Sequence, residues 1–560
     1  MVVFADQEQE KHLDILRKRE EEEVVEILSH KYGVQYVDLS LVAINTDALR
    51  LIKEDESHDA ETVVFGRVGK RLSVAVRSPE NSKAKMVIEK LKELGYDTVT
   101  FMASQESLKR AYERYADLSY ATESKAGVFE ISPAEIEELA SKVQNLTDIG
   151  TLINEAIVIK KTYRITRILE VILAGGLSTE ASDVHMEPEE AAVRLRYRLD
   201  GVLVDILTFD HETYRLLLSR LKLLSGLKLN ITSEAQDGRF SIKIKGDEIE
   251  LRTSVLPGNY GETLVLRILN PKAISVTLEE LGMGEKLRQR IEREITRPNG
   301  MVLTTGPTGS GKTTTLYAFL RKINSPGTKI ITIEDPIEYH LPGIVQTQVD
   351  EKKYTFAEGL RSILRQDPDI IMVGEIRDEE VAATAINAAL TGHLVFSTLH
   401  TNDAAGSFPR LIDLSVPEKV LSSSVNIAMA QRLVRKLCQQ CKKERPINAE
   451  EKITIERILG GIVDRTLVPQ TISTIWDPAP QGCAVCKGRG YKGRIGIFEA
   501  IYMDRPIEEV LRTKPSEREV AEAAKPQGIP TMVEDGIIKI LLGVTSLEEL
   551  RRVVDIDAIV

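Results

Sequence analysis

The sequence predicts a multidomain α/β protein, and three observations support this. The chain has 560 residues, whereas domains average on the order of 100–200 residues, so roughly three or four domains are expected. From about residue 273 onward, strand-like apolar runs alternate with helical patterns, as in parallel α/β sheets. One of these runs leads directly into a glycine-rich segment at 306–313, which has the pattern of a phosphate-binding loop.

Composition argues against membrane-spanning and secreted proteins and disfavours nonspecific nucleic-acid binding. No run approaches the 18 or more apolar residues of a membrane-spanning helix. The N-terminus turns acidic at once and lacks the apolar run of a secretory signal. We therefore expect a cytoplasmic protein that reaches a membrane only through partners. The net charge of -11, from 74 basic and 85 acidic residues, disfavours nonspecific attraction to nucleic acid. A local basic site is still compatible with this net charge.

The first block, residues 1–118, predicts a small α+β domain without an obvious catalytic cluster. Apolar residues at helical spacing predict a helix within 11–30. Asn81 or Ser82 can cap a second helix, and Gly95 can end it. Strands are expected at 62–65, 72–76 and 98–102.

A polar segment at 119–150 separates the first block from the second. It predicts a linker carrying one helix, which begins at Ser132. The second block, residues 151–272, predicts another α+β domain. The pair Asp200-Gly201 between two alternating runs indicates a tight hairpin turn. Strands are expected at 192–197, 202–207, 240–244, 249–254 and 263–269.

The segment Gly306-Pro-Thr-Gly-Ser-Gly-Lys312-Thr313 lies between a strand-like run and a helical pattern, the context that a phosphate-binding loop requires. Glycines let the backbone turn its N–H groups toward an anion, and the helix N-terminus adds positive partial charge. Lys312 can reach the β- and γ-phosphates, and the Thr313 hydroxyl can ligate Mg²⁺. We expect the nucleotide phosphates to be bound by Gly306, Pro307, Thr308, Gly309, Ser310, Gly311, Lys312, Thr313 and Thr314.

Carboxylates follow two further strand-like runs. Glu334 and Glu338 come after the run at 329–333, and Glu375 comes after the run at 370–373. Open α/β sheets bind ligands at the carboxyl ends of their strands. One of these carboxylates can orient Mg²⁺ through water and another can position the attacking water. An ordinary acidic loop is the alternative for each site taken alone.

Two histidines flank the strand-like run at 394–398. His400 follows it and is a candidate for sensing the γ-phosphate through a hydrogen bond. His393 precedes it and is a second candidate. For both, the alternative is a histidine that only satisfies hydrogen bonds within a packed loop.

All four cysteines of the chain occur in two Cys-x-x-Cys pairs. Cys438, Cys441, Cys483 and Cys486 can form a four-thiolate tetrahedral site, which suits Zn²⁺. With four protein ligands, no position is left for a substrate, so the expected role is structural. The pairs are too far apart for a simple zinc finger and are expected in an inserted subdomain at about 432–498. Four unliganded thiols are the alternative.

Together, these motifs resemble those of secretion ATPases of the type II secretion and type IV pilus assembly family, in its assembly-motor branch. Gly306–Thr313 matches the family's Walker A box, and Ile331–Tyr339 matches its aspartate box. Ile370–Asp378 matches its atypical Walker B box, in which Gly374 stands in place of an aspartate, and His393–Asp403 matches its histidine box. Four boxes in this order make the resemblance highly specific.

The resemblance implies a division of the chain. It predicts an N-terminal docking domain at 1–118, a linker at 119–150 and a PAS-like α+β domain at 151–272. It also predicts a RecA-like P-loop ATPase core at 273–560 that carries the zinc-binding insertion.

The resemblance also implies roles for site residues. Glu375 is the leading candidate for positioning or activating water, with Glu334 and Glu338 supporting the metal and water network. Arginines that stabilise phosphoryl transfer in trans accelerate it by about 10³–10⁵; a solvated side chain is the alternative for each. The implied arginines are Arg252 and Arg267, which reach the nucleotide from the preceding domain, and Arg361, Arg365 and Arg377, which lie near the subunit boundary.

The implied function is a homo-hexameric, Mg²⁺-dependent ATP hydrolase with structural Zn²⁺. Hydrolysis would rotate domains about the connection near 270–271. An inner-membrane platform protein would pass this motion on to pilin-like subunits of a type IV pilus or a type II secretion pseudopilus. The first block would dock onto a cytoplasmic component at the membrane, and no cyclic dinucleotide binding is predicted. Open alternatives are a DNA-uptake motor, a nucleic-acid translocase and a nonhydrolysing scaffold.

Overall fold

The computed structural model describes residues 21–556 except for 43, 50, 69, 118–127, 131–137, 140–141, 159–160, 245–246, 271–275, 351–352 and 469–471. The chain divides into two compact units, residues 1–122 with 156–168, and residues 123–155 with 169–560. The helix expected to begin at Ser132 starts outside the described residues, as do the N-terminal half of the helix expected within 11–30 and residue 271 of the expected hinge.

The first unit contains a four-stranded sheet in the order β1-β4-β3-β2. Asn81 caps the helix after β3, because its side chain accepts the Lys83 N–H, and Gly95 follows the helix at φ +85°. Of the two predicted caps, Asn81 is therefore the correct one. The strands are Gln35–Tyr36 (β1), Thr62–Val68 (β2), Arg71–Val76 (β3) and Asp97–Met102 (β4), and the helices are Thr46–Leu49 (α2), Glu54–Asp59 (α3), Ser82–Glu93 (α4) and Gln105–Glu113 (α5).

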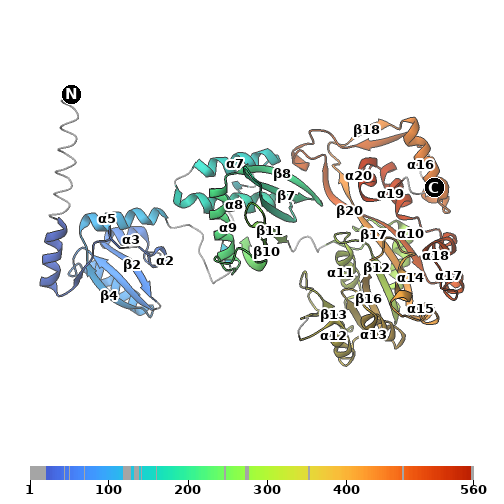
Figure 1. The fold of residues 1–560 in the computed structure, drawn as a ribbon, viewed down its shortest axis with the longest axis horizontal. Coiled ribbons are helices and arrows are strands. Elements are labelled where there is room, and N and C mark those ends of the chain that lie inside the picture. The colour runs from blue at the N-terminus through green and yellow to red at the C-terminus, as the bar shows by residue number, and fades with distance from the viewer. Residues whose placement is uncertain are drawn as a thin grey trace. The chain divides into compact units, whose positions relative to one another are not determined.

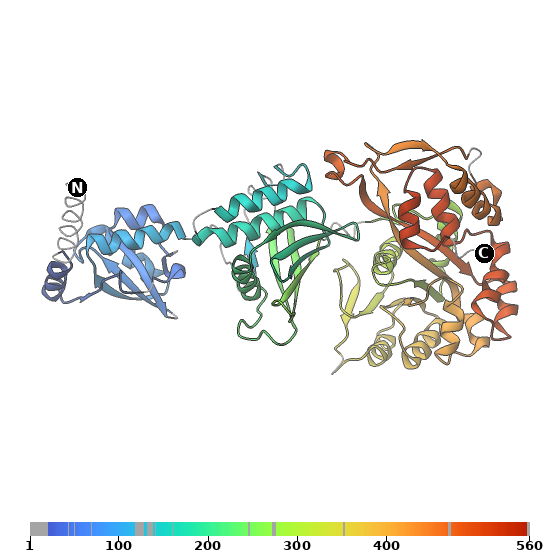
Figure 2. The same cartoon turned by 45° about the horizontal axis from the view of Figure 1, so that its top comes forward.

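A seven-stranded sheet in the order β5-β9-β10-β11-β6-β7-β8 opens the second unit (Figure 1). The hairpin between β7 and β8 turns at Asp200 and Gly201, with φ of 50° and 87°, as predicted from the Asp-Gly pair. The parts of α7 and α8 that belong to this unit, residues 146–155 and 169–178, lie along one face of this sheet (Figure 2). Tyr197 of β7 donates its hydroxyl to the Ile172 carbonyl of α8 at 2.6 Å. The elements are Val128–Glu130 (β5), Leu146–Val158 (α7), Lys161–Ser178 (α8), Asp183–Pro188 (β6), Val193–Leu199 (β7), Val202–Phe209 (β8), His211–Leu224 (α9), Gln236–Ile244 (β9), Asp247–Leu256 (β10) and Thr263–Leu269 (β11).

The second unit continues with another seven-stranded sheet, in the order β14-β13-β15-β16-β12-β17-β20. Its neighbouring strands are parallel except for β17 and β20, which are antiparallel. The strands are Gly300–Thr305 (β12), Ile330–Glu334 (β13), Val345–Gln348 (β14), Ile370–Val373 (β15), Leu394–Leu399 (β16), Val425–Leu437 (β17) and Tyr491–Tyr502 (β20). The helices are Glu285–Glu294 (α10), Lys312–Ile323 (α11), Phe356–Leu364 (α12), Glu379–Leu390 (α13), Ser407–Asp413 (α14), Glu418–Ser424 (α15), Arg505–Leu511 (α17), Glu517–Ala524 (α18), Met532–Leu541 (α19) and Leu547–Val553 (α20).

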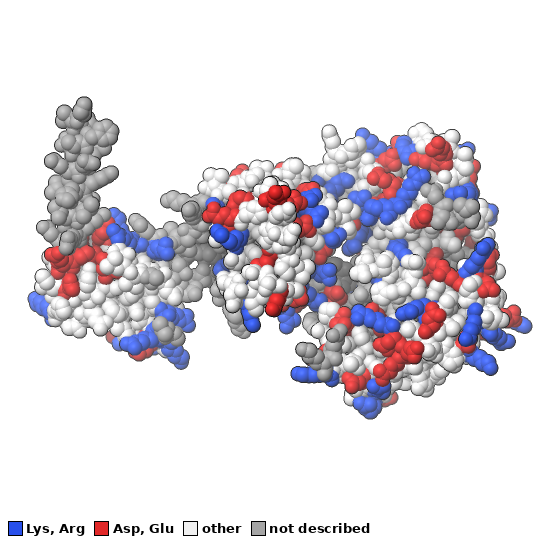
Figure 3. Space-filling model, in the orientation of Figure 1, with Lys and Arg blue, Asp and Glu red and all other residues white. Residues whose placement is uncertain are grey.

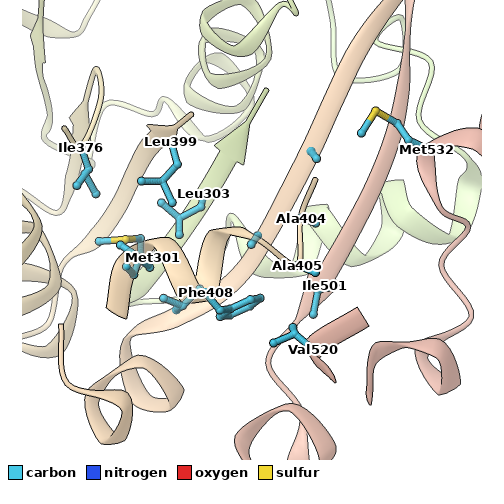
Figure 4. Close-up of a cluster of buried hydrophobic side chains, with 14 of the residues drawn as sticks. Met301, Leu303, Ile376, Leu399, Ala404, Ala405, Phe408, Ile501, Val520 and Met532 are labelled. Atoms are coloured by element: carbon cyan, nitrogen blue, oxygen red, sulfur yellow. The ribbon is translucent and has the colours of Figure 1, made fainter. Parts of the chain in front are cut away.

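Apolar side chains bury both faces of the parallel strands. Successive residues of β12 point to opposite faces, so Met301 and Leu303 belong to one core cluster and Val302 to another. Figure 4 shows the first cluster. Because parallel strands end at the same edge of the sheet, the loops after β12, β13, β15 and β16 share one edge, where the four motifs lie.

Between β17 and β20 the chain forms a small subdomain. It contains the two-stranded sheet of Lys443–Pro446 (β18) and Thr474–Asp477 (β19), and the helix Ala449–Gly461 (α16). Asn448 and Glu451 form a reciprocal cap at the start of α16. Over the described parts of the chain, every helix is too short or too polar to cross a bilayer.

Candidate functional site

The loop between β12 and α11 needs glycine at its critical positions. Gly306, Gly309 and Gly311 have φ of +143°, +79° and +94°, values that other residues rarely adopt. A Cβ on Gly306 would lie 2.7 Å from the Gln431 carbonyl oxygen, and one on Gly311 would lie 2.9 Å from the Gln431 amide nitrogen. The loop therefore keeps its shape only with these glycines.

Lys312, the first residue of α11, folds back over this loop. Its ammonium group donates to the carbonyls of Gly306 at 2.7 Å and Pro307 at 3.2 Å. Burial lowers the pKa of Lys312, and the nearby Glu375 charge opposes that shift. The ammonium group thus lies beside the loop whose N–H groups would bind phosphate oxygens.

Polar atoms around the loop fit a phosphate and its metal ion. The buried Ser310 and Thr315 hydroxyls and the Gln431 amide oxygen find no hydrogen-bond partner among the described residues. Buried polar groups without partners are rare in proteins. Thr313 is exposed at the start of α11, so its hydroxyl is open to a cation. The arrangement suits a nucleoside triphosphate with Mg²⁺.

Glu334, the last residue of β13, is buried and held by three donors. Its side chain accepts hydrogen bonds from the Thr332 hydroxyl at 2.5 Å, the Gln346 amide at 3.0 Å and the Tyr317 hydroxyl. A buried carboxylate is stable only with such partners. The sequence indicated Glu334 but none of these donors. They come from α11, β13 and β14, and their spacing along the chain carries no motif.

Glu375, His400 and Arg377 meet at the carboxyl ends of β15 and β16. One Glu375 oxygen lies 3.1 Å from His400 Nε2, and the other pairs with the Arg377 guanidinium group. The Glu375 side chain is 13% exposed and that of His400 is 51% exposed. A carboxylate oriented in this way can position a water molecule, and the accessible histidine can contact a ligand.

His393 precedes β16 and therefore lies at the other end of that strand from His400. Its Nδ1 is 3.1 Å from the Ala388 carbonyl oxygen at the end of α13. This contact favours the structural alternative for His393.

Two predicted arginines come from the first seven-stranded sheet. Arg252 of β10 donates to the Ile337 carbonyl at 2.7 Å and lies 3.7 Å from the Glu338 carboxylate. Arg267 of β11 instead pairs with Asp183 at 3.2 Å, and its side chain is 59% exposed. The two arginines stand directly opposite each other on β10 and β11, but only Arg252 donates a described hydrogen bond to the aspartate box, whereas Arg267 pairs with Asp183 of its own sheet.

Arg361 and Arg365 contact residues of the helices that follow β14 and β15. Arg361 pairs with Glu380 of α13 at 2.6 Å, and Arg365 donates to the Ser362 hydroxyl of α12 at 3.0 Å. The Arg361 side chain is 47% exposed. The structure does not bring these two arginines together with Glu375 and His400 through any contact that it describes.

Arg432 of β17 is a basic residue at the site that sequence reasoning missed. Its guanidinium group donates to the Asn402 carbonyl at 2.8 Å and to the Gln431 carbonyl at 3.1 Å. It also lies 3.1 Å from where a Cβ on Gly306 would stand. Burial lowers its pKa. The only signal in the sequence is a charge within a long apolar strand.

The four cysteines form one cluster whose geometry matches zinc. Their sulfur atoms all lie within 4.8 Å of one another. Cys438 and Cys483 are 3.7 Å apart, and the pairs Cys441–Cys486 and Cys483–Cys486 are each 3.8 Å apart. A tetrahedral site with Zn–S bonds of about 2.3 Å separates its sulfurs by about 3.8 Å. The donor set and the spacing therefore fit Zn²⁺.

Backbone N–H groups support this cluster. The Cys486 sulfur accepts the N–H groups of Cys483 at 3.1 Å and Gly490 at 3.3 Å. Burial opposes ionisation of Cys486, but these hydrogen bonds, together with those from the Cys441 and Cys483 side chains, outweigh it and lower its pKa to about 7. Burial raises the pKa of Cys441. A bound cation would favour the thiolate form of all four.

Two family models and several curated proteins are similar to this chain. The family model described as type II/IV secretion system protein matches residues 159–552, and the MshEN domain model matches residues 32–122. Type II secretion system protein E of Pseudomonas aeruginosa is 45% identical over 390 residues, which cover 70% of this chain and 75% of that protein. Type IV pilus assembly ATPase PilB of Myxococcus xanthus is 36% identical over 535 residues, which cover 95% and 91%.

A solved structure shares the fold. The X-ray structure of the Yersinia pseudotuberculosis ATPase DotB matches with a TM-score of 0.51, covering 71% of this chain and 94% of that one at 19% identity. The predicted α/β fold with a RecA-like core is confirmed. The family model spans most of the sequence, and the Myxococcus relative aligns along nearly its whole length. The chain therefore belongs to the type II/IV secretion system protein family.

Proposed function

We propose that this protein is a Mg²⁺-dependent ATP hydrolase that works as a hexameric motor at the cytoplasmic face of the inner membrane. The motor powers assembly of pilin-like subunits through an inner-membrane platform protein. The observation that carries the proposal is the placement of Lys312 on a glycine-rich loop beside the paired side chains of Glu375 and His400. The names of the Pseudomonas and Myxococcus relatives support the secretion and pilus context.

In this proposal the site residues divide phosphate binding, metal binding and water positioning among them. The loop N–H groups and Lys312 bind the phosphates, and the Thr313 hydroxyl holds Mg²⁺. When bound, the ion neutralises charge that develops on the phosphate oxygens. Glu375 positions the attacking water, and His400 orients Glu375 and responds to the γ-phosphate. Glu334, fixed by its three donors, completes the metal and water network.

Arginines from the preceding domain couple this chemistry to movement. Arg252 already contacts the aspartate box, and in the ATP-bound state its guanidinium group contacts a bound phosphate. Arg267 joins it there after releasing Asp183, and Arg361, Arg365 and Arg377 act across the subunit boundary. Loss of the γ-phosphate removes these contacts, and the domain of residues 151–272 rotates about the connection near residues 270–271. The N-terminal domain docks onto a cytoplasmic partner, and zinc stabilises the cysteine subdomain.

A nucleic-acid translocase fits the chain less well. Such a protein needs a basic or aromatic-lined channel, whereas the net charge here is -11 with a single Trp. On the face shown in Figure 3, acidic and basic side chains are interspersed over the second unit. A DNA-uptake motor of the same family would differ in its partners rather than in this site.

Phosphate release by the full chain with ATP and Mg²⁺ tests the proposal. Lys312→Ala and Glu375→Gln should each slow turnover by about 10²-fold or more. Glu509→Gln is the matched control, because it neutralises an exposed carboxylate of α17 that pairs only with Arg505 at 2.9 Å in the contacts described. Vesicles containing a platform protein should stimulate the wild type, and single-stranded DNA should not. Turnover that survives both site substitutions would overturn the assignment.

A further inference from the structure

A carboxylate on β20 joins two parts of the chain that are far apart in sequence. One oxygen of Glu499 accepts the Ala404 N–H at 2.8 Å, and the other accepts the Met532 N–H at 2.9 Å. Ala404 lies in the loop that begins at His400, and Met532 is the first residue of α19. One side chain therefore connects the loop after β16 to a C-terminal helix.

The strand register explains how Glu499 reaches that loop. Glu499 stands directly opposite Ala430 of β17, so the two side chains lie on the same face of the sheet. The Ala430 methyl group is small, and Glu499 can extend across it. Around the contact, Ala404 and Met532 belong to the buried cluster that also holds Phe408, Ile501 and Val520 (Figure 4). On their other side, Glu499, Ala404 and Met532 line a cavity of about 1030 Å³ together with the charged side chains of Asp403 and Arg432.

The same loop is fastened to the phosphate loop from its other side. The Thr401 N–H donates to the Thr305 hydroxyl at 2.8 Å, at the end of the strand that leads into the phosphate loop. Arg432 holds the Asn402 carbonyl at 2.8 Å while it packs beside Gly306. Residues 400–404 therefore contact the strand that leads into the phosphate loop at one end and Glu499 at the other.

Capping of α19 accounts for only one of the two contacts of Glu499. Thr531 and Glu534 form a reciprocal cap, in which each side chain accepts the other residue's N–H. This cap leaves the Met532 N–H, which Glu499 accepts. Capping alone would not require a side chain that also reaches Ala404, so the second contact ties the helix to the loop after β16.

We propose that Glu499 is a positioning residue that couples the nucleotide site to α19. When the γ-phosphate moves the loop after His400, Glu499 transmits that movement to the first turn of the helix. Helix α19 and the C-terminal segment around it are then the part of the ATPase domain that responds to the nucleotide state. This inference rests on the proposed function, because it uses the same phosphate site.

Hydrogen exchange of the full chain tests the coupling. Amide exchange in 532–541 is compared with AMP-PNP and with ADP, both with Mg²⁺. Allosteric couplings typically change an equilibrium by about fivefold or more, so the wild type should show a difference of at least that size between the two nucleotides. In Glu499→Gln, one acceptor oxygen becomes an NH₂ group, and the difference should disappear.

Asp535→Asn is the matched control. Asp535 is a buried carboxylate that likewise joins β20 to α19, and it accepts the Phe498 N–H at 2.9 Å. Its described partners are Phe498 and Lys539, neither of which belongs to the histidine box. In this control, the amides of 532–541 should exchange faster with either nucleotide, and the difference in exchange between AMP-PNP and ADP should remain. If both variants lost the difference in exchange between AMP-PNP and ADP equally, Glu499 would serve packing alone and the proposal would be overturned.

A second variant keeps the test decisive if Glu499→Gln is unstable. Glu499→Asp retains the charge but is one methylene shorter, so it cannot span both N–H groups and should also lose the difference. Failure of both variants to fold would leave a purely structural role and contradict the coupling. AMP-PNP is not hydrolysed, so the exchange result is independent of turnover. If the protein released no phosphate from ATP but its amide exchange still depended on the nucleotide, the proposed motor would be refuted and the coupling would stand.

Discussion

The Tyr317→Phe substitution tests whether Glu334 is fixed by its three donors. Tyr317 is fully buried on α11, and its hydroxyl donates to Glu334. Phenylalanine fills nearly the same volume, so the main change is the loss of one hydrogen bond to a buried carboxylate. Hydrogen bonds to charged groups contribute about 1.5–3 kcal/mol. Thr332 and Gln346 still donate to Glu334 in this variant. We therefore expect the free energy of unfolding to decrease by an amount within this range and by no more.

Urea unfolding followed by intrinsic fluorescence measures this change. Trp476 is the single tryptophan of the chain, and it packs against Gly543 at the end of α19, so its signal reports on the C-terminal domain. Tyr354→Phe is the matched control, because its hydroxyl accepts only a long hydrogen bond of 3.3 Å from the neutral Thr347 among the bonds described. The control should lose about 1 kcal/mol or less. Equal losses in the two variants would refute the role given to Tyr317.

Three further predictions concern packing, zinc and pH. Gly359→Ala should lower the melting temperature, because its Cβ would lie 2.1 Å from Ile333 Cδ1 and overpacking costs about 1–3 kcal/mol; an unchanged melting temperature would contradict this contact. Cys483→Ser should abolish stoichiometric zinc in elemental analysis and lower the melting temperature, whereas full zinc content would contradict the four-thiolate site. A hydrogen bond with Asp403, aided by partial burial, raises the pKa of Glu517 from 4.5 to about 7. The folded state therefore holds this proton where the unfolded chain releases it, and stability should fall as pH rises from about 4.5 to 7. Thermal melts of Glu517→Gln should lack that decline, and an identical pH profile would contradict the shift.

Features set by local sequence were predictable. The phosphate loop depends on glycines within one short segment, and each Cys-x-x-Cys pair places its sulfurs through a single turn. The Asp200-Gly201 hairpin likewise follows from two adjacent residues that tolerate positive φ. The meeting of Glu375 with His400 was also predictable, because parallel strands end at one edge of the sheet.

Features that depend on packing between distant segments could not be predicted from the sequence. The donors around Glu334 come from three elements, and nothing in their spacing indicates one site. Arg432 and Glu499 lie in long strands where a charge usually faces solvent, and the register of β17 with β20 brings them beside the loop after β16. The resemblance indicated Arg252 and Arg267 together, and they do stand opposite each other on β10 and β11, but their described partners differ, which the sequence did not indicate.

Structures of the assembled protein with AMP-PNP and with ADP test the central claim most directly. If hydrolysis drives movement, the domain that carries Arg252 must change its orientation relative to the domain that carries Lys312 when the γ-phosphate is absent. We predict a rotation between the two states. The Arg252 guanidinium group should contact phosphate only in the AMP-PNP state. The same orientation in every subunit of both states would contradict the account.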